Sequence, residues 1–289
     1  MSSPRIAFVT FDKEPQIAED DAIAAAALRD RNAKVEAAVW SDPSVRWDDF
    51  DLVVIRSTWD YHERAPEFSN WLERLERTSA RVWNPVGSLI WNMDKRYLLE
   101  LAGKGVPIVP TRRLERGEHA SLENVLRQER WTNVVVKPAV SAGSFGTFRA
   151  SLADADKSEQ AFHRLLANSD VLVQPFVEEI LEGGEWSLLF FGNEFSHALV
   201  KRPSQGDFRT QSSFGATHAR VVPGEGLLRQ ARTAIEATGE RHLYARVDGV
   251  MVREQFQLME LELIEPCLYL DRDRPAAERF ANAAMALTK

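Results

Sequence analysis

Residues 244–264 constrain the fold most, because apolar and polar side chains alternate along both halves of this segment. The alternation predicts two strands, and the polar turn at 253–255 predicts that they form an antiparallel hairpin. A turn centred on Glu254 places Asp248 directly opposite Glu260, with Glu262 on the same face as Glu260. Three carboxylates therefore crowd one surface of the predicted sheet.

Two interpretations of this acidic face stay open. Opposed like charges destabilise a sheet, and carboxylates combined with substrate phosphates are typical ligands of Mg²⁺. In the same register Arg246 faces Glu262, so an ordinary cross-strand ion pair is the alternative. The opposite face of the hairpin is predicted to carry the apolar side chains of Val247, Met251, Met259, Leu261 and Leu263.

The segment 1–86 alternates between short apolar runs and amphipathic or Ala-rich runs, a pattern that predicts an α/β unit. Strands are expected at 5–11, 34–40 and 52–55, and helices at 18–31 and 65–78. Ligands of open α/β sheets lie beyond the carboxyl ends of the strands. We therefore expect substrate contacts in the loop after the third strand, from Arg56, Ser57, Thr58, Asp60 and Tyr61. In the alternative, Trp59 and Tyr61 only cap the sheet, and Arg56 and Asp60 form a surface pair.

The segment 87–176 is predicted to be a second, smaller α+β unit. Helices are expected at 92–103, from 121 and at 157–168, and strands at 108–111, 133–138, 147–150 and 171–176. Lys137 ends an apolar strand, and the small residues of 141–147 follow it. Their backbone N–H groups are able to approach phosphate closely. A flexible hairpin is the alternative for this loop.

The segment 177–289 forms the third predicted unit, with strands at 185–191 and 195–201, the hairpin, and helices at 225–238 and from 275. Just before it, Pro175 interrupts the strand VLVQPFV, a pattern that exposes backbone groups to a flat heterocycle or merely ends a buried strand. Lys201, Arg202 and Arg209 form a cationic cluster that favours an anion.

Composition and motifs exclude several other functions. The chain has 36 Lys and Arg against 43 Asp and Glu, a net charge of −7 that argues against binding nucleic acid. We expect neither a signal peptide nor a membrane helix, and the single Cys267 leaves the cytoplasm as the expected compartment. The sequence has no GxxxxGK[ST], GxGxxG, GxSxG or HExxH motif, so it lacks the signatures of the common nucleotide folds and hydrolases.

Taken in order, these motifs resemble the ATP-grasp superfamily of carboxylate:amine and carboxylate:thiol ligases. The resemblance implies an α/β fold in which a first domain is followed by two α+β lobes that enclose ATP. It also implies ATP and Mg²⁺ as cofactors, with Mn²⁺ as an alternative. Nucleotide contacts are then expected from Lys95, Lys137, Ser141, Gly143, Ser144, Gln174, Phe176, Val177 and Glu185.

The resemblance assigns further roles to particular residues. Glu182 competes with Glu185 for the ribose. Lys201 and Arg209 are expected to act on the transferred phosphate. Asp248, Glu260 and Glu262 are the expected metal ligands, although Glu262 stands where many relatives have Asn.

More narrowly, RSTWDY, SAGSFGT, SLLFF, FSHALVKRPSQGDFR and MELELIEP resemble the branch that contains D-cycloserine synthetase, an O-ureido-D-serine cyclo-ligase. The resemblance implies a role in antibiotic biosynthesis on a small amino-acid-like substrate, with a homodimer allowed and no membrane or nucleic-acid partner. The alternatives are a non-catalytic nucleotide- or metabolite-binding protein on the same scaffold and a small-molecule kinase.

Overall fold

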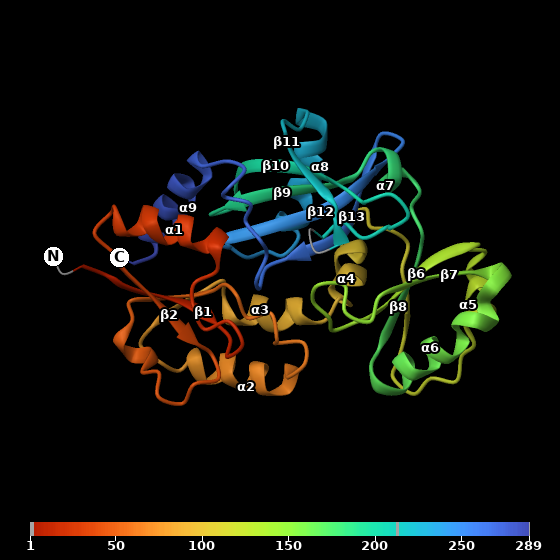
Figure 1. Ribbon diagram of the computed structural model, residues 1–289, viewed down its shortest axis with the longest axis horizontal. Helices are drawn as coiled ribbons and strands as arrows, with labels where there is room; N and C mark the ends of the chain where they lie inside the picture. The colour runs from red at the N-terminus through yellow and green to blue at the C-terminus, as the bar shows by residue number, and fades with distance from the viewer. Residues whose placement is uncertain (1–2, 212–213, 289) are drawn as a thin grey trace.

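The chain forms three β-sheets, one after another along the sequence (Figure 1). The computed structural model describes residues 3–211 and 214–288. The three sheets lie within the three predicted segments, while the domain boundaries at 86/87 and 176/177 stay a prediction. Within the described residues, we find no helix with the length and apolar character needed to cross a membrane.

The first sheet is parallel, with strand order β2-β1-β3-β4. Its strands are β1 (Arg5–Thr10), β2 (Lys34–Val39), β3 (Leu52–Ile55) and β4 (Arg81–Trp83). On one face, α1 (Glu19–Arg29) packs together with α9 (Pro275–Ala286), and on the other α2 (Ala65–Leu75) packs with α3 (Val86–Met93). The alternation of β1 produces this double-sided core, because Ile6 and Phe8 face α9 while Ala7 and Val9 face α2.

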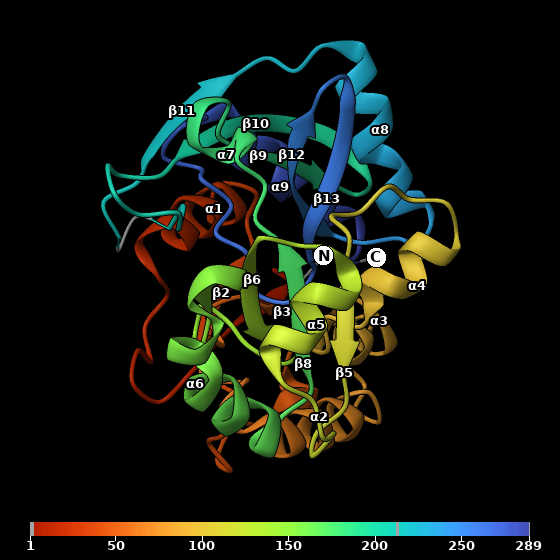
Figure 2. The same cartoon turned by 90° about the vertical axis from the view of Figure 1, so that its right-hand side faces the viewer.

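The central sheet is antiparallel, with strand order β5-β8-β6-β7. Its strands are β5 (Arg112–Leu114), β6 (Asn133–Pro138), β7 (Phe148–Ser151) and β8 (Val171–Pro175). Figure 2 shows α5 (Leu122–Glu129) and α6 (Ala155–Asn168) on one side of it, packed on the apolar residues of the strands. The other side is left to the site described below.

The third sheet has the order β11-β10-β9-β12-β13 and is antiparallel. Its strands are β9 (Glu185–Phe191), β10 (Glu194–Arg202), β11 (Thr217–Val221), β12 (Tyr244–Val252) and β13 (Gln255–Glu262). Helix α8 (Glu225–Glu236) and helix α4 (Tyr97–Gly103) supply side chains to the core on its apolar face, and the short α7 (Glu179–Glu182) precedes β9.

The predicted pairing of the hairpin is confirmed at its acidic end. Asp248 faces Glu260, and Arg246 faces Glu262. The alternation of the two strands therefore places the carboxylates as expected, on the face of the sheet that looks toward the central lobe.

The turn of the hairpin differs from the prediction. It contains two residues, because β13 already begins at Gln255. The register shifts by one residue between Asp248 and Gly249, which leaves Met259 as the extra residue of a β-bulge. The predicted place of Met259 on the apolar face is wrong, since the bulge brings it to the cavity that the acids line.

Two other predicted elements are wrong in extent. The segment expected to be one helix at 92–103 contains the end of α3 and the whole of α4. Between the two helices the Lys95 N–H donates to the Ala139 carbonyl at 2.8 Å and not to a helical carbonyl, which interrupts the helix. The strand expected at 108–111 is an isolated bridge from Ile108 to Leu258, and Pro110 has no N–H to extend it. The edge strands β4, β5 and β11 were not predicted.

Candidate active site

A cavity of about 880 Å³ lies between the central sheet and the third sheet. Its lining comes from all three sheets: Tyr61 follows β3, Lys137 and Gln174 lie on β6 and β8, and Asp248 and Glu260 lie on the hairpin. The loop 141–147 contributes Ser141, Ala142, Gly143, Ser144, Phe145 and Thr147 to the lining. Most of the residues expected to bind nucleotide, phosphate and metal are thus brought together.

Asp248 is the most buried of the hairpin acids, with 1% of its surface exposed. It accepts hydrogen bonds from the Arg246 guanidinium at 2.9 Å, from the Lys201 ammonium at 3.2 Å and from the Ser187 hydroxyl. Burial alone would raise the pKa of Asp248, but Arg246 and Lys201 outweigh it and lower this pKa to about 2. Asp248 is therefore ionised at neutral pH.

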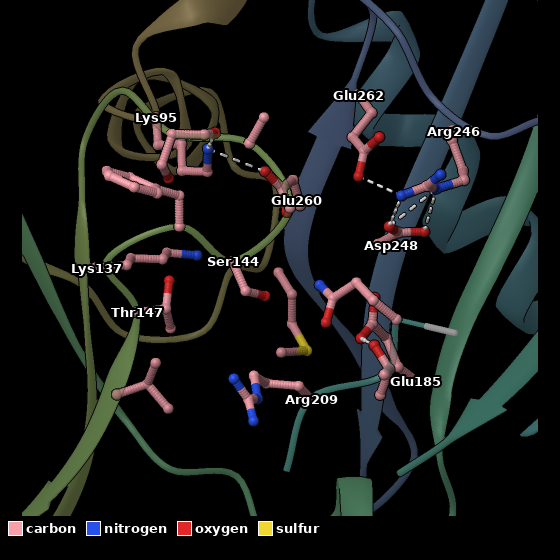
Figure 3. A pocket seen from close by; sticks show the side chains of 18 of the residues that line it. Lys95, Lys137, Ser144, Thr147, Glu185, Arg209, Arg246, Asp248, Glu260 and Glu262 are labelled. Atoms are coloured by element: carbon pink, nitrogen blue, oxygen red, sulfur yellow. Dashed lines mark hydrogen bonds and ion pairs between the residues drawn. The ribbon is translucent and has the colours of Figure 1, made fainter. Parts of the chain in front are cut away.

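The two acids on β13 are held by different cations (Figure 3). Glu260 lies 3.2 Å from the Lys95 ammonium, and Glu262 pairs with Arg246. Burial opposes ionisation of Glu260, but Lys95 and Lys137 lower its pKa overall. For Glu262, burial outweighs Arg246 and raises the pKa to about 8. Lys95 thus holds Glu260, and Arg246 is shared by Asp248 and Glu262.

The ion pairs of these acids bear on metal binding, because a metal ion would compete with Lys95 and Arg246 for the carboxylate oxygens. Among residues 3–211 and 214–288, no three His, Cys, Asp or Glu side chains already converge as a metal-binding group. The donor chemistry fits Mg²⁺, because Asp248, Glu260 and Glu262 offer hard oxygens on one wall of one cavity. A metal there would replace Lys95 and Arg246 as the partners of the acids on β13.

Lys95 and Lys137 differ in how many partners the protein provides for their ammonium groups. Lys95 is 5% exposed and donates to the Ser141 carbonyl in addition to pairing with Glu260. The Lys137 ammonium makes no hydrogen bond or ion pair with the part of the chain that the structure describes. Burial lowers the pKa of Lys137, and the neighbouring Glu260 opposes that shift. Its ammonium is therefore available to an anion in the cavity.

Arg209 enters from the loop after β10 and is held within that loop. Its guanidinium donates to Asp207 at 2.7 Å and lies 3.5 Å from the centre of the Phe214 ring. Lys201, on β10, lies 2.6 Å from Glu185 in addition to its contact with Asp248. Both residues line the cavity, so the two positions expected to act on the transferred phosphate are brought to one place.

The segment 174–177, which is expected to contact the nucleotide, spans the end of β8. The Gln174 side chain donates to the Thr111 hydroxyl at 2.8 Å, and the Phe176 N–H donates to the Asn133 carbonyl at 2.8 Å. Gln174, Phe176, Val177 and Glu185 line the cavity. Glu182 is exposed at the end of α7 and is not part of that lining.

The loop after β3 is divided. Tyr61 lines the cavity, whereas Arg56, Ser57, Thr58 and Asp60 are buried outside its lining. Arg56 and Ser57 bond to Asp21 at 2.8 and 3.0 Å, and Asp60 accepts from the indole N–H of Trp40 at 2.9 Å. A surface pair of Arg56 with Asp60 is not formed, and direct contact of these four residues with substrate stays a prediction.

Sequence reasoning missed several residues of the lining, among them Asn92, Tyr97, Glu265 and Tyr269. Arg246 was interpreted only as a partner of Glu262, yet it bridges Asp248 and Glu262 inside the cavity. The one available signal for Glu265 is its place just after the acidic strand, before Pro266.

A cavity between two antiparallel sheets, with Lys95 and Lys137 opposite the acids of the hairpin, defines the class of ATP-grasp ligases. Residues 6–84 match the family described as D-cycloserine synthetase DcsG, N-terminal domain, and residues 105–228 match the prokaryotic glutathione synthetase, ATP-grasp domain. The cycloserine biosynthesis protein DcsG of Streptomyces lavendulae is 33% identical over 279 residues, which cover 89% of this chain and 90% of that protein.

Solved structures agree with the sequence comparison. The crystal structure of D-cycloserine synthetase DcsG matches with a TM-score of 0.90 at 31% identity, over 99% of this chain and 100% of that one. The D-alanine–D-alanine ligase of Bacillus anthracis, complexed with ATP, has the same fold, with a TM-score of 0.70 at 13% identity over 99% and 97% of the two chains. The chain belongs to the D-cycloserine synthetase family of ATP-grasp ligases, which confirms the expected fold class and an ATP-dependent ligase that forms a C–N bond.

Proposed function

We propose that the chain uses ATP and Mg²⁺ to activate the carboxylate of a small amino acid as an acyl phosphate, which a nitrogen of the same molecule attacks to close a ring. The observation that carries the proposal is that Lys95 and Lys137 line one cavity together with the ionised Asp248 and with Glu260 and Glu262, and that no described residue occupies the Lys137 ammonium. The relatives named for cycloserine biosynthesis support the ring closure and a role in making an antibiotic.

The nucleotide is proposed to lie along the central lobe. Its adenine would contact the hinge at 174–177, its ribose Glu185, and its phosphates Lys95, Lys137 and the loop residues Ser141, Gly143 and Ser144. Lys137 supports this arrangement, because its ammonium lines the cavity and no described residue occupies it. A point charge without a protein partner is suited to a phosphate oxygen.

The metal is proposed to bind to Asp248, Glu260 and Glu262, with Mn²⁺ as an alternative to Mg²⁺. When bound, it would neutralise the negative charge of the phosphates. The chain itself supplies ionised carboxylates for that purpose, because Arg246 and Lys201 keep Asp248 charged. Release of Arg246 and Lys95 from these acids would free both cations for the substrate and the nucleotide.

Two bond changes complete the reaction. An oxygen of the substrate carboxylate attacks the γ-phosphorus of ATP, and ADP leaves. The nitrogen then attacks the carbonyl carbon, the C–O bond to phosphate breaks, and the nitrogen loses a proton. Lys201 and Arg209 are placed to neutralise the charge of the transferred phosphate, and no nucleophilic side chain is required. Closure of the loop 141–147 would exclude water from the acyl phosphate.

The test is ADP formation with a panel of amino acids, in which O-ureido-D-serine is the first substrate and mass spectrometry follows the product. A ligase gives substrate-dependent ADP, free phosphate and a cyclised product, all dependent on Mg²⁺. A kinase would instead release a phosphorylated acid, and a binding protein would show only thermal stabilisation by ATP. Either of those two outcomes refutes the proposal.

The proposed compartment is the cytoplasm, where the free Cys267 stays reduced. A homodimer stays a prediction, and measurement of the mass in solution by light scattering tests it.

A further inference from the structure

Glu265 differs from the other acids that line the cavity, because no lysine or arginine among the described residues pairs with its carboxylate. It follows the end of β13 by three residues and lines the same cavity as Asp248, Glu260 and Glu262. Each of those three carboxylates is held by a lysine or an arginine. The Glu265 carboxylate accepts a hydrogen bond from its own backbone N–H, but it makes no hydrogen bond or ion pair with any other residue in 3–211 or 214–288.

The backbone on both sides of Glu265 is nevertheless fixed. The Ile264 carbonyl accepts a hydrogen bond from the Tyr244 hydroxyl at 2.8 Å, and the Pro266 carbonyl accepts one from the Arg56 guanidinium at 2.7 Å. Arg56 is 2% exposed and is itself held by Asp21 at 2.8 Å. An unpaired carboxylate is thus carried on a segment that two buried side chains hold in place.

The charges around Glu265 point to a cation that the protein does not supply. Burial raises the pKa of Glu265 to about 7, with Lys95 opposing the shift and Glu260 adding to it. Lys95 is already engaged by Glu260 and by the Ser141 carbonyl. A carboxylate among other carboxylates in a buried cavity is costly unless a positive group joins it.

The position of Glu265 agrees with the substrate side of the cavity. Burial raises the pKa of Tyr61, and among the neighbouring charges Glu265 adds most to that rise. Tyr61 is the one predicted substrate residue that lines the cavity. The nucleotide side, with Lys137 and the loop 141–147, comes from the central lobe instead. Glu265 therefore lies where the loop after β3 of the first sheet meets the acids of the hairpin.

We propose that Glu265 receives the ammonium group of the amino-acid substrate, and that Arg56 is a positioning residue that holds the Glu265 segment through the Pro266 carbonyl. This inference rests on the proposed function for the identity of the ligand as an amino acid. The ammonium and the carboxylate of an α-amino acid are bonded to the same carbon, so an ammonium on Glu265 keeps the carboxylate in the same cavity as the phosphate-binding cations.

The decisive experiment compares substrates with and without the ammonium group. Calorimetry measures the binding of O-ureido-D-serine and D-serine, and of their des-amino analogues 3-(ureidooxy)propanoate and 3-hydroxypropanoate, to the protein loaded with Mg²⁺ and a non-hydrolysable ATP analogue. The wild type is expected to bind the amino acids about 10- to 100-fold more tightly than the analogues, the worth of one charge-assisted hydrogen bond. Glu265→Gln is expected to lose that preference and to bind the ATP analogue as the wild type does.

The matched control is Glu63→Gln. Glu63 also lines the cavity, but its half-exposed side chain already pairs with Lys13 at 3.6 Å, so this variant removes the same charge from a carboxylate that has a partner. The control should keep the preference for the amino acid. A wild type without the preference, or a Glu265→Gln protein that retains it, overturns the proposal.

Arg56→Lys tests the positioning role. A lysine has no planar fork with which to bond Asp21 and the Pro266 carbonyl together. It should weaken binding of the amino acids several-fold and leave the des-amino analogues unaffected, a selectivity that general loss of structure would not produce. Equal weakening of both kinds of ligand refutes the positioning role. If the variant does not fold, the Glu265→Gln comparison alone decides whether the ammonium binds at Glu265.

The outcomes also separate this inference from the ligase proposal. A preference that Glu265→Gln abolishes, without ADP formation by the wild type, supports the ammonium site and refutes the ligase. If the wild type forms ADP and Glu265→Gln still binds the amino acids more tightly than the des-amino analogues, the ammonium site is refuted and the ligase proposal stands.

Discussion

Asp248 faces Glu260 directly across the hairpin only because a bulge at Met259 shifts the pairing of the two strands. From the turn up to Gly249, the strands pair in a register that, if continued, would set Asp248 opposite Met259. The extra residue brings the two carboxylates together on the cavity wall. The bulge is therefore a requirement of the acidic site, and residues that hold it should matter as much as the acids.

Gly249→Ala should destabilise the protein at the bulge. An added Cβ would lie 2.5 Å from the Gln257 carbonyl oxygen and would also meet the Phe256 ring, so backbone would have to move. We expect a loss of about 1–3 kcal/mol in the free energy of unfolding. Chemical denaturation measures it against Gly226→Ala on α8, where nothing lies within 4 Å of an added Cβ. Equal stability of the two variants would show that the bulge tolerates a side chain.

Glu260→Gln should abolish most of the activity while preserving the fold. The variant removes a proposed metal ligand and leaves its size unchanged, so we expect kcat to fall by about 100-fold or more, with a higher Mg²⁺ requirement. Glu254→Gln, at the exposed tip of the same hairpin, is the control and should behave as the wild type. A Glu260→Gln enzyme with an unchanged magnesium titration would remove Glu260 from the set of ligands.

Lys137→Met should weaken ATP binding by about 10- to 100-fold, because a charge-assisted contact to phosphate is lost. No described partner of Lys137 is left unpaired by the change, so the fold should persist. Calorimetry with ATP and Mg²⁺ checks the affinity, and Lys157→Met on the exposed face of α6 serves as control. Unchanged affinity in a folded Lys137→Met protein would mean that the loop assignment is wrong.

The protein should lose stability as the pH falls from about 6.5 to about 4. Burial lowers the pKa of His242 from 6.5 to about 4, so the unfolded chain takes up a proton in this range that the folded chain does not. The contribution of His242 saturates at about 3 kcal/mol below pH 4, and His197, whose pKa burial also lowers to about 4, adds a second contribution in the same window. His242→Gln should reduce the pH dependence of Tm in this window without removing it, whereas His119→Gln, at an exposed position, should leave it unchanged. Parallel curves for His242→Gln and the wild type would contradict the assignment.

Local patterns predicted most of the strands, because their alternation and apolar runs follow directly from which face is buried. The acidic pairing also followed, but for an incomplete reason: the assumed turn was one residue off, and the bulge compensated. The local sign of the bulge is Gly249 inside a strand, where the Phe256 ring and the Gln257 carbonyl leave no room for a Cβ.

The loop after β3 shows why the site was only partly predictable. Its composition suggested substrate contacts, but Arg56 turns inward to Asp21 and to the Pro266 carbonyl, 210 positions away in the sequence. Likewise, Glu265 has no motif of its own, and its importance appears only once the cavity and its ion pairs are known. Side-chain direction in loops depends on tertiary partners that a linear pattern does not contain.

Helix α9 follows every strand of the third sheet, yet it packs on the first sheet, where Phe280 meets Phe8 edge to face at 6.2 Å. During synthesis on the ribosome, α1 covers only part of this side of the first sheet, and the rest of it must wait for residues 275–286 to emerge. Until then that apolar surface is available to chaperones, and truncation before α9 should yield an aggregating chain rather than a shortened enzyme.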